Sequence, residues 1–261
     1  MPGKPRTKPS KGRPSELFHP IRIVPLHPGK AKAQAPQVPA KLTYRNGPLL
    51  TSVQVFTVFW GGAWNDAPQS ALPSQINDFF DFILGSELLD QLAEYSVPGK
   101  AISRGLLLGT ATLTSGGPGK TVDDSAIQDF LQREMSAGTL PASTANTLYF
   151  LFLPPGVTVT QGGSASCKVF CGYHDAINGS IFYAVMPYPN CSGCLGGVAA
   201  FDALTSTSSH ELCEAITDPV PGQGWYDDNN GEIGDICAWQ TRTLGRYSVQ
   251  LEWSNKANRC I

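Results

Sequence analysis

Beyond its N-terminal part, the chain alternates short hydrophobic runs with segments whose apolar residues recur at helical spacing. Four runs rich in β-branched and aromatic residues predict strands, at 53–60, 106–113, 148–153 and 181–186. Apolar residues three and four positions apart predict helices at 73–84 (with an extension past Gly85), 121–135 and 198–217. Pro219 ends the last helix, because proline cannot continue the hydrogen-bond ladder. One more strand is expected at 247–253, in an otherwise irregular C-terminal segment.

The order of these elements is β-α-β-α-β-β-α. It predicts an α/β (α+β) fold, in which a twisted mixed sheet is layered with helices. No run of about 18 apolar residues exists, so we expect no transmembrane segment. With 27 Gly, 21 Pro and only 15% charged residues, the chain is turn-rich, which excludes a coiled coil and a charged disordered protein.

Charge divides the chain into two parts. Residues 1–42 contain nine basic side chains and one acidic one, whereas the remainder contains ten basic and twenty acidic. We therefore expect a disordered, Pro-rich basic leader or pro-segment at 1–42 and a single folded domain at 43–261. The leader could be merely solvated, lie across an acidic cleft, or anchor the chain to an anionic surface. Its start lacks the apolar core of a secretory signal, and the acidic body argues against a nucleic-acid partner.

The strongest chemical signal is the H-E-x-x-E motif at residues 210–214. His210 and Glu214 are four residues apart on a predicted helix, so both side chains project from one face and could bind one cation. Glu211 occupies the position where H-E-x-x-H zinc hydrolases place their general base. Glutamate in place of the second histidine is still an acceptable zinc ligand. The alternative is an ordinary polar helix face.

A zinc hydrolase with two ligands on a helix needs a third from a later segment, with one position left open for water. Glu232 or Asp235 could supply that ligand, and the other could orient His210. Asp218 is a rival ligand. His174 is a further candidate, either as a ligand or as a catalytic group that stabilises the oxyanion of the transition state.

Seven cysteines allow two interpretations. Cys167-x3-Cys171 and Cys191-x2-Cys194 approach the spacing of a zinc ribbon, whereas a disulfide framework would indicate an oxidising compartment. Cys213 lies inside the H-E-x-x-E helix and is the candidate for a buried free thiol. Spacing alone does not decide between these readings.

Several segments, in order, resemble the EXORDIUM-like, phosphate-induced protein family, which is named from plants and has microbial relatives. The similarity covers most of residues 44–261. The segments that carry it are FCGYH (170–174), NCxxC (190–194), SHExxE (209–214) with TDP (217–219), GWY (224–226), EIGDIC (232–237), QxxW (250–253) and Cys260.

The resemblance implies a secreted protein with three disulfides among Cys167, Cys171, Cys191, Cys194, Cys237 and Cys260, and with Cys213 free. The family often has Asn at the position of Asp218, which argues against that residue as an essential ligand, while Glu232 and Asp235 match. The element order also resembles the upper lobe of zincin-like peptidases. That resemblance implies that strand 182–186 pairs with an extended peptide substrate.

Together these features predict a secreted, monomeric zinc metalloendopeptidase. His210, Glu214 and either Asp235 or Glu232 would hold zinc, and Glu211 would act as general base on a metal-activated water that attacks a peptide bond. The partner would be a peptide or protein substrate. The alternative is a non-catalytic, extracellular wall-associated or signalling protein with a structural or vestigial metal site.

Overall fold

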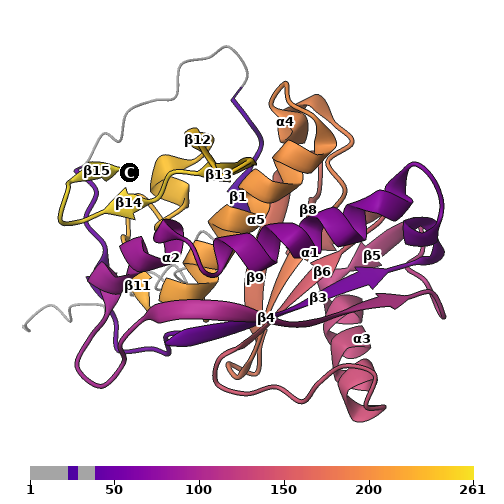
Figure 1. The fold of residues 1–261 in the computed structure, drawn as a ribbon, viewed down its shortest axis with the longest axis horizontal. Coiled ribbons are helices and arrows are strands. Elements are labelled where there is room, and N and C mark those ends of the chain that lie inside the picture. The colour runs from indigo at the N-terminus through magenta and orange to yellow at the C-terminus, as the bar shows by residue number, and fades with distance from the viewer. Residues whose placement is uncertain (1–22, 29–38) are drawn as a thin grey trace, which may run out of the picture.

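A twisted six-stranded sheet forms the centre of the computed structural model, which describes residues 23–28 and 39–261 (Figure 1). Its strand order is β1 (Ile23–Pro25), β9 (Phe170–Ile177), β10 (Ile181–Met186), β6 (Thr147–Phe152), β3 (Ser52–Trp60) and β4 (Ser103–Leu113). Strands β10, β6, β3 and β4 are parallel, whereas β9 is antiparallel to both β10 and β1. The predicted mixed sheet is confirmed.

Helices cover both faces of this sheet. α1 (Leu72–Ile83) and α5 (Ala200–Thr217) lie on one face and α3 (Asp124–Ser136) on the other (Figure 1). The shorter helices are α2 (Glu87–Gln91), α4 (Ser192–Leu195), η1 (Gly62–Asn65), η2 (Gln69–Ala71), η3 (Leu92–Tyr95) and η4 (Asp235–Cys237). The small sheets are β2 (Thr43–Tyr44) with β11 (Trp225–Tyr226), β12 (Thr241–Leu244) with β13 (Tyr247–Gln250), β14 (Trp253–Ser254) with β15 (Arg259–Cys260), and β5 (Thr121–Asp123), β7 (Thr158–Gln161) and β8 (Ser164–Ala165) together. No helix of the described residues has the length and apolar character needed to cross a bilayer.

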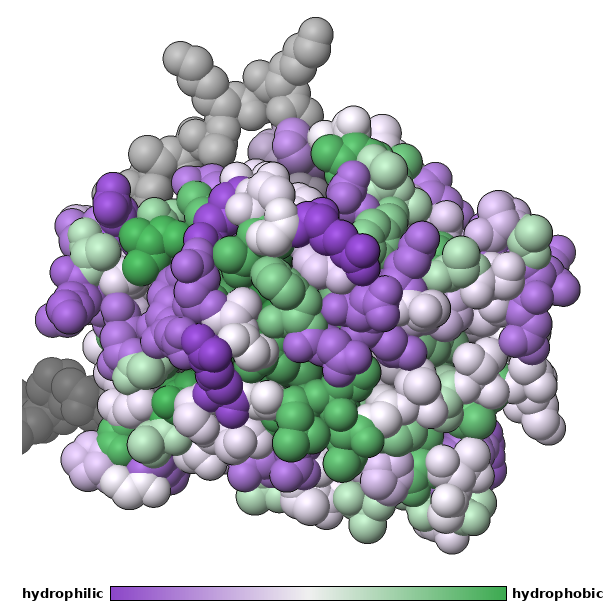
Figure 2. Space-filling view, viewed as in Figure 1, coloured by the Kyte–Doolittle hydropathy of each residue, from purple (hydrophilic) through white to green (hydrophobic). Residues whose placement is uncertain are grey.

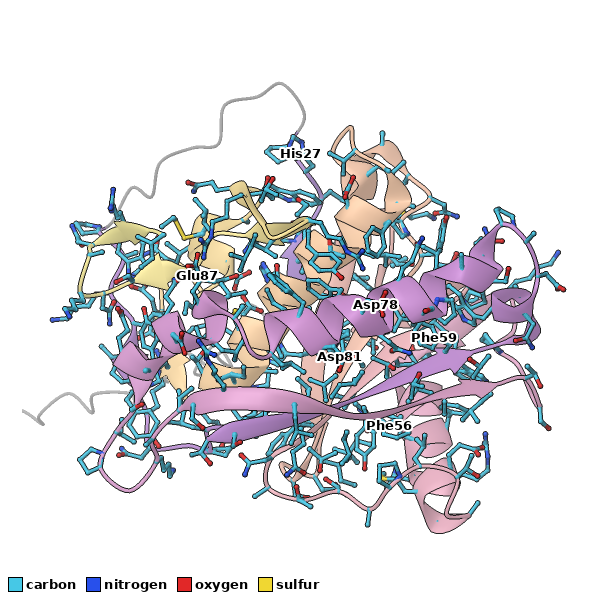
Figure 3. All side chains as sticks on the ribbon, viewed as in Figure 1. His27, Phe56, Phe59, Asp78, Asp81 and Glu87 are labelled. Carbon is cyan, nitrogen blue, oxygen red and sulfur yellow. A yellow bond between two sulfur atoms is a disulfide. The ribbon has the colours of Figure 1, made fainter. Side chains whose placement is uncertain are left out.

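Alternate side chains of the central strands enter two separate cores, as the two-residue period of a strand requires. On β3, Phe59 packs under α1 and stacks on Phe152, while Phe56 points to the opposite face and packs near Tyr149 (Figure 3). The edge strand β4 leaves Leu106 and Leu108 about half exposed, and Figure 2 shows green, apolar side chains over this strand. The larger core lies between the sheet, α1, α5 and the C-terminal segment.

The predicted strands and helices all exist, but β9 was not predicted. Its sequence, FCGYHDAI, mixes Gly, His and Asp with apolar residues, and its first five residues are buried, so no polar–apolar alternation marks it. The predicted strand at 247–253 divides into β13 and β14. β10 occupies the place of the predicted substrate-binding strand, and that expectation is wrong. Both edges of β10 are hydrogen-bonded, to β6 and β9, so no edge is left for a peptide.

Parts of the predicted leader belong to the fold. β1 pairs with β9 and buries Val24, and Ala40 and Leu42 are also buried. The structured region therefore includes residues on the leader side of the expected boundary at 42/43. The rest of the expected leader, residues 1–22 and 29–38, lies outside the described residues.

Three disulfides hold the second half of the chain together: Cys167–Cys191, Cys171–Cys194 and Cys237–Cys260. The first two join the start of β9 to α4 and the loop before it. Cys213 is buried and free. The zinc-ribbon interpretation is wrong, because each of its four sulfurs is bonded to another sulfur, and disulfide-bonded cysteines do not offer thiolate ligands.

Candidate metal centre

Helix α5 presents the H-E-x-x-E residues in a buried position. His210, Glu211 and Glu214 are fully buried, and Ser209 on the same helix accepts a hydrogen bond from the backbone N–H of Gln250 on β13, at 2.9 Å. The helix ends at Thr217, as expected. The next residue, Asp218, accepts hydrogen bonds from three backbone N–H groups of the following loop, those of Gly222, Gln223 and Gly224. Its carboxylate is occupied in shaping that loop, which removes the support for Asp218 as a rival metal ligand.

Strand β9 brings His174 next to Glu211 on α5, although these two residues lie 37 positions apart in the sequence. The Nδ1 atom of His174 lies 3.0 Å from Oε2 of Glu211 and 3.5 Å from Oε2 of Glu214. Its Nε2 atom lies 3.1 Å from the carbonyl oxygen of Asp218. Two residues earlier, Gly172 faces the same helix, and a Cβ at that position would lie 2.8 Å from Cγ2 of Thr207, 2.9 Å from Cε of Met186 and 3.3 Å from Oε1 of Glu211. Glycine thus leaves room for these three side chains.

On the other side of Glu214, His210 forms a second group of potential ligands. Its Nε2 atom lies 2.9 Å from Oε1 of Glu214, which also accepts the backbone N–H of Asp235 at 3.0 Å. The Gln250 amide nitrogen faces Nδ1 of His210 at 2.7 Å and donates to the carbonyl oxygen of Gly234 at 2.9 Å. A cation on Nε2 of His210 would require Gln250 to present its oxygen to Nδ1 instead, because a metal-bound imidazole carries its hydrogen on the other nitrogen.

The two alternative third ligands lie on different sides of Glu214. Asp235, which is partly buried, groups with His210 and Glu214, and its Oδ2 accepts the backbone N–H of Glu232 at 3.0 Å. Glu232 is fully buried, and its Oε1 lies 3.5 Å from Nε2 of His174. Two sets of side chains offer ligand atoms within 4.8 Å of one another: His174, Glu211 and Glu214; and His210, Glu214 and Asp235.

Burial and mutual repulsion shift the pKa values of these carboxyl groups. Burial raises the pKa of Glu232 and Asp235 well above their ordinary values, and the nearby Glu214 adds to the increase. Burial also raises the pKa of Glu211. Glu214 differs, because its two histidine neighbours, His210 foremost, overcome the effect of burial and lower its pKa to about 2.

The histidines respond in the opposite direction. Burial alone would lower the pKa of His210, but the Glu214 carboxylate outweighs it and raises that pKa to about 10. Burial likewise opposes protonation of His174, yet the carboxylates of Glu232, Glu211 and Glu214 raise its pKa well above 6.5. In the metal-free site, the raised pKa values of both histidines and of Glu232 and Asp235 therefore favour bound protons, which reduce the negative charge of the buried group.

Several buried polar atoms of the site have no hydrogen-bond partner among the described residues. They are Nε2 of His210, Oε1 of Glu211, Oε2 of Glu214 and both carboxylate oxygens of Glu232. Unpaired buried carboxylate oxygens are costly, and a bound cation satisfies them. Imidazole nitrogens combined with carboxylate oxygens are a donor set that suits zinc. The residues present therefore fit a divalent metal ion.

Two residues near the site were not singled out as candidates from the sequence. Gln250 contacts His210 directly, as described above. Glu252 is fully buried, neither of its oxygens has a hydrogen-bond partner within the described part of the chain, and burial raises its pKa well above the ordinary value. Burial and the nearby Glu252 also raise the pKa of the Cys213 thiol. Gln250 ends β13 and Glu252 lies between β13 and β14. Neither has a distinctive spacing relative to the motif, so the sequence pattern gave no signal for either.

The outer edge of β9 is covered by the chain's own N-terminal segment, residues 23–28. Ile23 and Val24 pair with Tyr173 and Gly172, beside His174. On its other side, the carbonyl of Pro25 accepts the indole N–H of Trp239 at 3.0 Å. The His27 ring packs edge-on against Trp239 and projects at the end of this segment (Figure 3). This segment thus lies between β9 and the C-terminal part of the chain.

A scan against models of protein families gives no match, and neither does a search of curated proteins. The interpretation of this site therefore depends on its own geometry.

Proposed function

We propose that this chain is a secreted zinc-dependent metallopeptidase whose centre is built from α5, β9 and the loop at 232–235. The observation that carries the proposal is the convergence of two histidines and three carboxylates, those of Glu211, Glu214 and Asp235, in two groups that share Glu214. Several of their ligand atoms have no partner among the described residues. His210, Glu214 and Asp235 would hold the zinc ion. When bound, zinc would polarise a peptide carbonyl and lower the pKa of a water towards about 7.

Two side chains of the protein supply the other catalytic roles, proton transfer and charge stabilisation. Glu211 is the general base, because its Oε1 has no partner in the described ranges, 23–28 and 39–261, while Oε2 is held 3.0 Å from His174. Burial raises the pKa of Glu211, which brings it closer to the working range of a proton acceptor near neutral pH. Glu211 would accept a proton and later deliver it to the leaving amine. His174, protonated between Glu211 and Glu214, would supply positive charge beside the reacting carbonyl.

Metal content and peptide hydrolysis, measured on one preparation, test the proposal. We expect the purified chain to contain zinc and to cleave casein, to lose cleavage after dialysis against a chelator, and to regain it with added zinc. Inductively coupled plasma mass spectrometry and a fluorescent casein assay measure the two properties. Absence of bound metal, or cleavage that persists after the metal has been removed, would overturn the proposal.

The segment at 23–28 leads to a second prediction, about how substrate reaches the centre. An extended peptide can pair with the outer edge of β9 only if β1 leaves it, because the same backbone groups hold both. Removal of residues 1–28 is expected to raise the rate of casein cleavage several-fold. Removal of residues 1–22 is the matched control, since it retains β1. Truncation should stop at residue 28, because Ala40 and Leu42 are buried in the core.

Equal activity of the two truncated forms would show that β1 does not limit access. Circular dichroism should accompany the assay, because Val24 packs with Cys171 and Cys194, and its loss could loosen that corner. A truncated form that retains its melting temperature and gains activity supports the inhibitory interpretation.

Membership of the EXORDIUM-like family and export from the cell are part of the same proposal. The six cysteines that match the family form three disulfides with Cys213 left free, which supports it. Disulfides form in oxidising compartments, which supports secretion. One observation favours the non-catalytic alternative: the side chains of His174, His210, Glu211 and Glu214 are all at most 1% exposed, as in a closed structural site. The casein assay separates the two.

A further inference from the structure

We propose that the centre binds two divalent cations, bridged by the carboxylate of Glu214. The first would lie between His210, Glu214 and Asp235, and the second between His174, Glu211 and Glu214. The second cation site extends the proposed function and rests on it for the first cation. In the two-cation centre His174 is neutral and binds through Nδ1, in place of the protonated His174 of the one-cation centre. Glu211 binds through Oε2, which leaves its Oε1 to act as the base.

The hydrogen bond of His174 prepares its other ring nitrogen to bind a metal. Nε2 lies 3.1 Å from the backbone carbonyl of Asp218, and a carbonyl oxygen can only accept a hydrogen bond. Nε2 must therefore carry hydrogen, and in a neutral ring Nδ1 then has the lone pair. A backbone carbonyl that holds the second N–H of a histidine is the usual support of a metal ligand. Nδ1 is directed at Glu211 and Glu214, where the second cation would lie.

The carboxylate of Glu214 has one oxygen on each side. Oε1 lies 2.9 Å from Nε2 of His210, whereas Oε2 lies 3.5 Å from Nδ1 of His174 and has no hydrogen-bond partner among the residues that the structure describes. One carboxylate that faces two separate imidazoles can bridge two metal ions. In two-metal enzyme sites such ions lie about 3.5–4 Å apart. The separation of the two ligand groups by a single carboxylate fits that arrangement.

The balance of formal charge also favours two cations. Six acidic residues surround the two histidines: Glu211, Glu214, Asp218, Glu232, Asp235 and Glu252. With neutral histidines and ionised acids, one divalent ion leaves this buried group with four excess negative charges, and two ions leave two. Oε1 of Glu211 also lacks a hydrogen-bond partner among the described residues, so the second site faces an oxygen that no protein group satisfies.

Metal stoichiometry in matched variants tests the second site without reference to activity. The full chain is loaded with Zn²⁺, passed through gel filtration, and its zinc content measured per mole of protein. We expect two ions in the native chain, one in His174→Gln and one in His210→Gln. Glu214→Gln should fall below one. His27→Gln and Glu134→Gln are the controls outside the centre and should keep two.

At the zinc absorption edge, crystals of the zinc-loaded chain should show two anomalous peaks, one on each side of Glu214. Cobalt loading adds an independent readout, because two bridged Co²⁺ ions are magnetically coupled and their electron paramagnetic resonance signal weakens. Coupling is expected to disappear in His174→Gln, with the signal of a single ion restored.

A single ion in the native chain, whichever histidine holds it, would overturn the two-cation site. The outcome is separable from that of the proposed function. One ion with chelator-sensitive casein cleavage would refute the second site and leave the peptidase standing. Two ions without cleavage would refute the peptidase and retain the second site.

Discussion

Glu211→Gln is expected to lower the rate of casein cleavage by about 10²–10⁴-fold, the usual contribution of a general base. Glutamine has nearly the same volume and can still accept a hydrogen bond through its oxygen, but its amide cannot take a proton from water. The change leaves His210 and Asp235 intact, so at least one zinc ion per chain should remain bound. Steady-state kinetics and metal content, measured on one preparation, are the readouts.

Glu134→Gln on α3 is the matched control for this variant. It makes the same chemical change in a partly exposed residue that pairs with Arg133, on the opposite face of the sheet from the centre. Its activity should equal that of the native chain. Unchanged activity in Glu211→Gln would exclude this residue as the base. Loss of all bound zinc would instead assign it a predominantly structural role.

Removal of metal is expected to lower the melting temperature by about 10 °C at neutral pH. A ligand that binds only the folded state at about a thousand times its dissociation constant contributes about 4 kcal/mol. In a chain of this size about 1 kcal/mol corresponds to 2–4 °C. The centre lies against the main core, beside Ile233 and Leu212, so its loosening should affect global unfolding and not only a loop. Differential scanning calorimetry of loaded and stripped protein measures the change.

The shifted pKa values determine how the stability of the metal-free protein changes with pH. His210 has a folded-state pKa of about 10, above its ordinary 6.5. Its contribution to the free energy of unfolding is therefore fully present below pH 6.5 and is lost as pH rises towards 10. The raised pKa values of Glu232 and Asp235 act in the same direction. Glu214, with a pKa lowered to about 2, stabilises the folded state above pH 4.5, and this stabilisation is lost on acidification towards pH 2.

The stripped protein should therefore lose stability as pH rises from 6.5. Metal ions replace the protons on these ligands, so metal affinity should increase over the same interval. The difference in melting temperature between loaded and stripped protein is expected to widen from pH 6 to pH 9. A constant difference would show that the metal does not compete with these protons.

The sequence predicts the strands and helices that have one kind of pattern along their length. β3, β6 and β10 are nearly continuous apolar runs because both faces of each strand are buried. The apolar residues of α1 and α3 recur at helical spacing because one face of each helix packs against a core. β9 has no such pattern. It carries Gly172 and His174 toward the centre, so its composition follows the needs of the site and not those of packing alone.

The candidate site likewise combines residues related by local spacing with residues that only the tertiary fold brings together. The spacing of His210 and Glu214 is local, because both lie on one helix, and the structure places them 2.9 Å apart. The position of His174 depends on the pairing of β9 with β10, and the contact of Gln250 depends on β13 lying along α5. Such contacts arise from long-range topology, which residue spacing does not encode. The sequence therefore indicated which residues could matter without indicating which side of Glu214 each would occupy.

The attachment of β1 to β9 determines how the covered strand edge could ever be opened. Residues 23–28 and 39–42 are both held in the fold, and only residues 29–38 connect them. While that connection is intact, β1 and β9 belong to one chain, and their pairing is intramolecular. One cut between residues 28 and 39 would turn the same contact into a bimolecular one, held by three paired residues, two hydrogen bonds to Trp239 and Gly193, and the packing of Val24 and His27. Dilution alone would then favour release, so a single proteolytic event could convert a self-occupied strand edge into one that is open to other peptides.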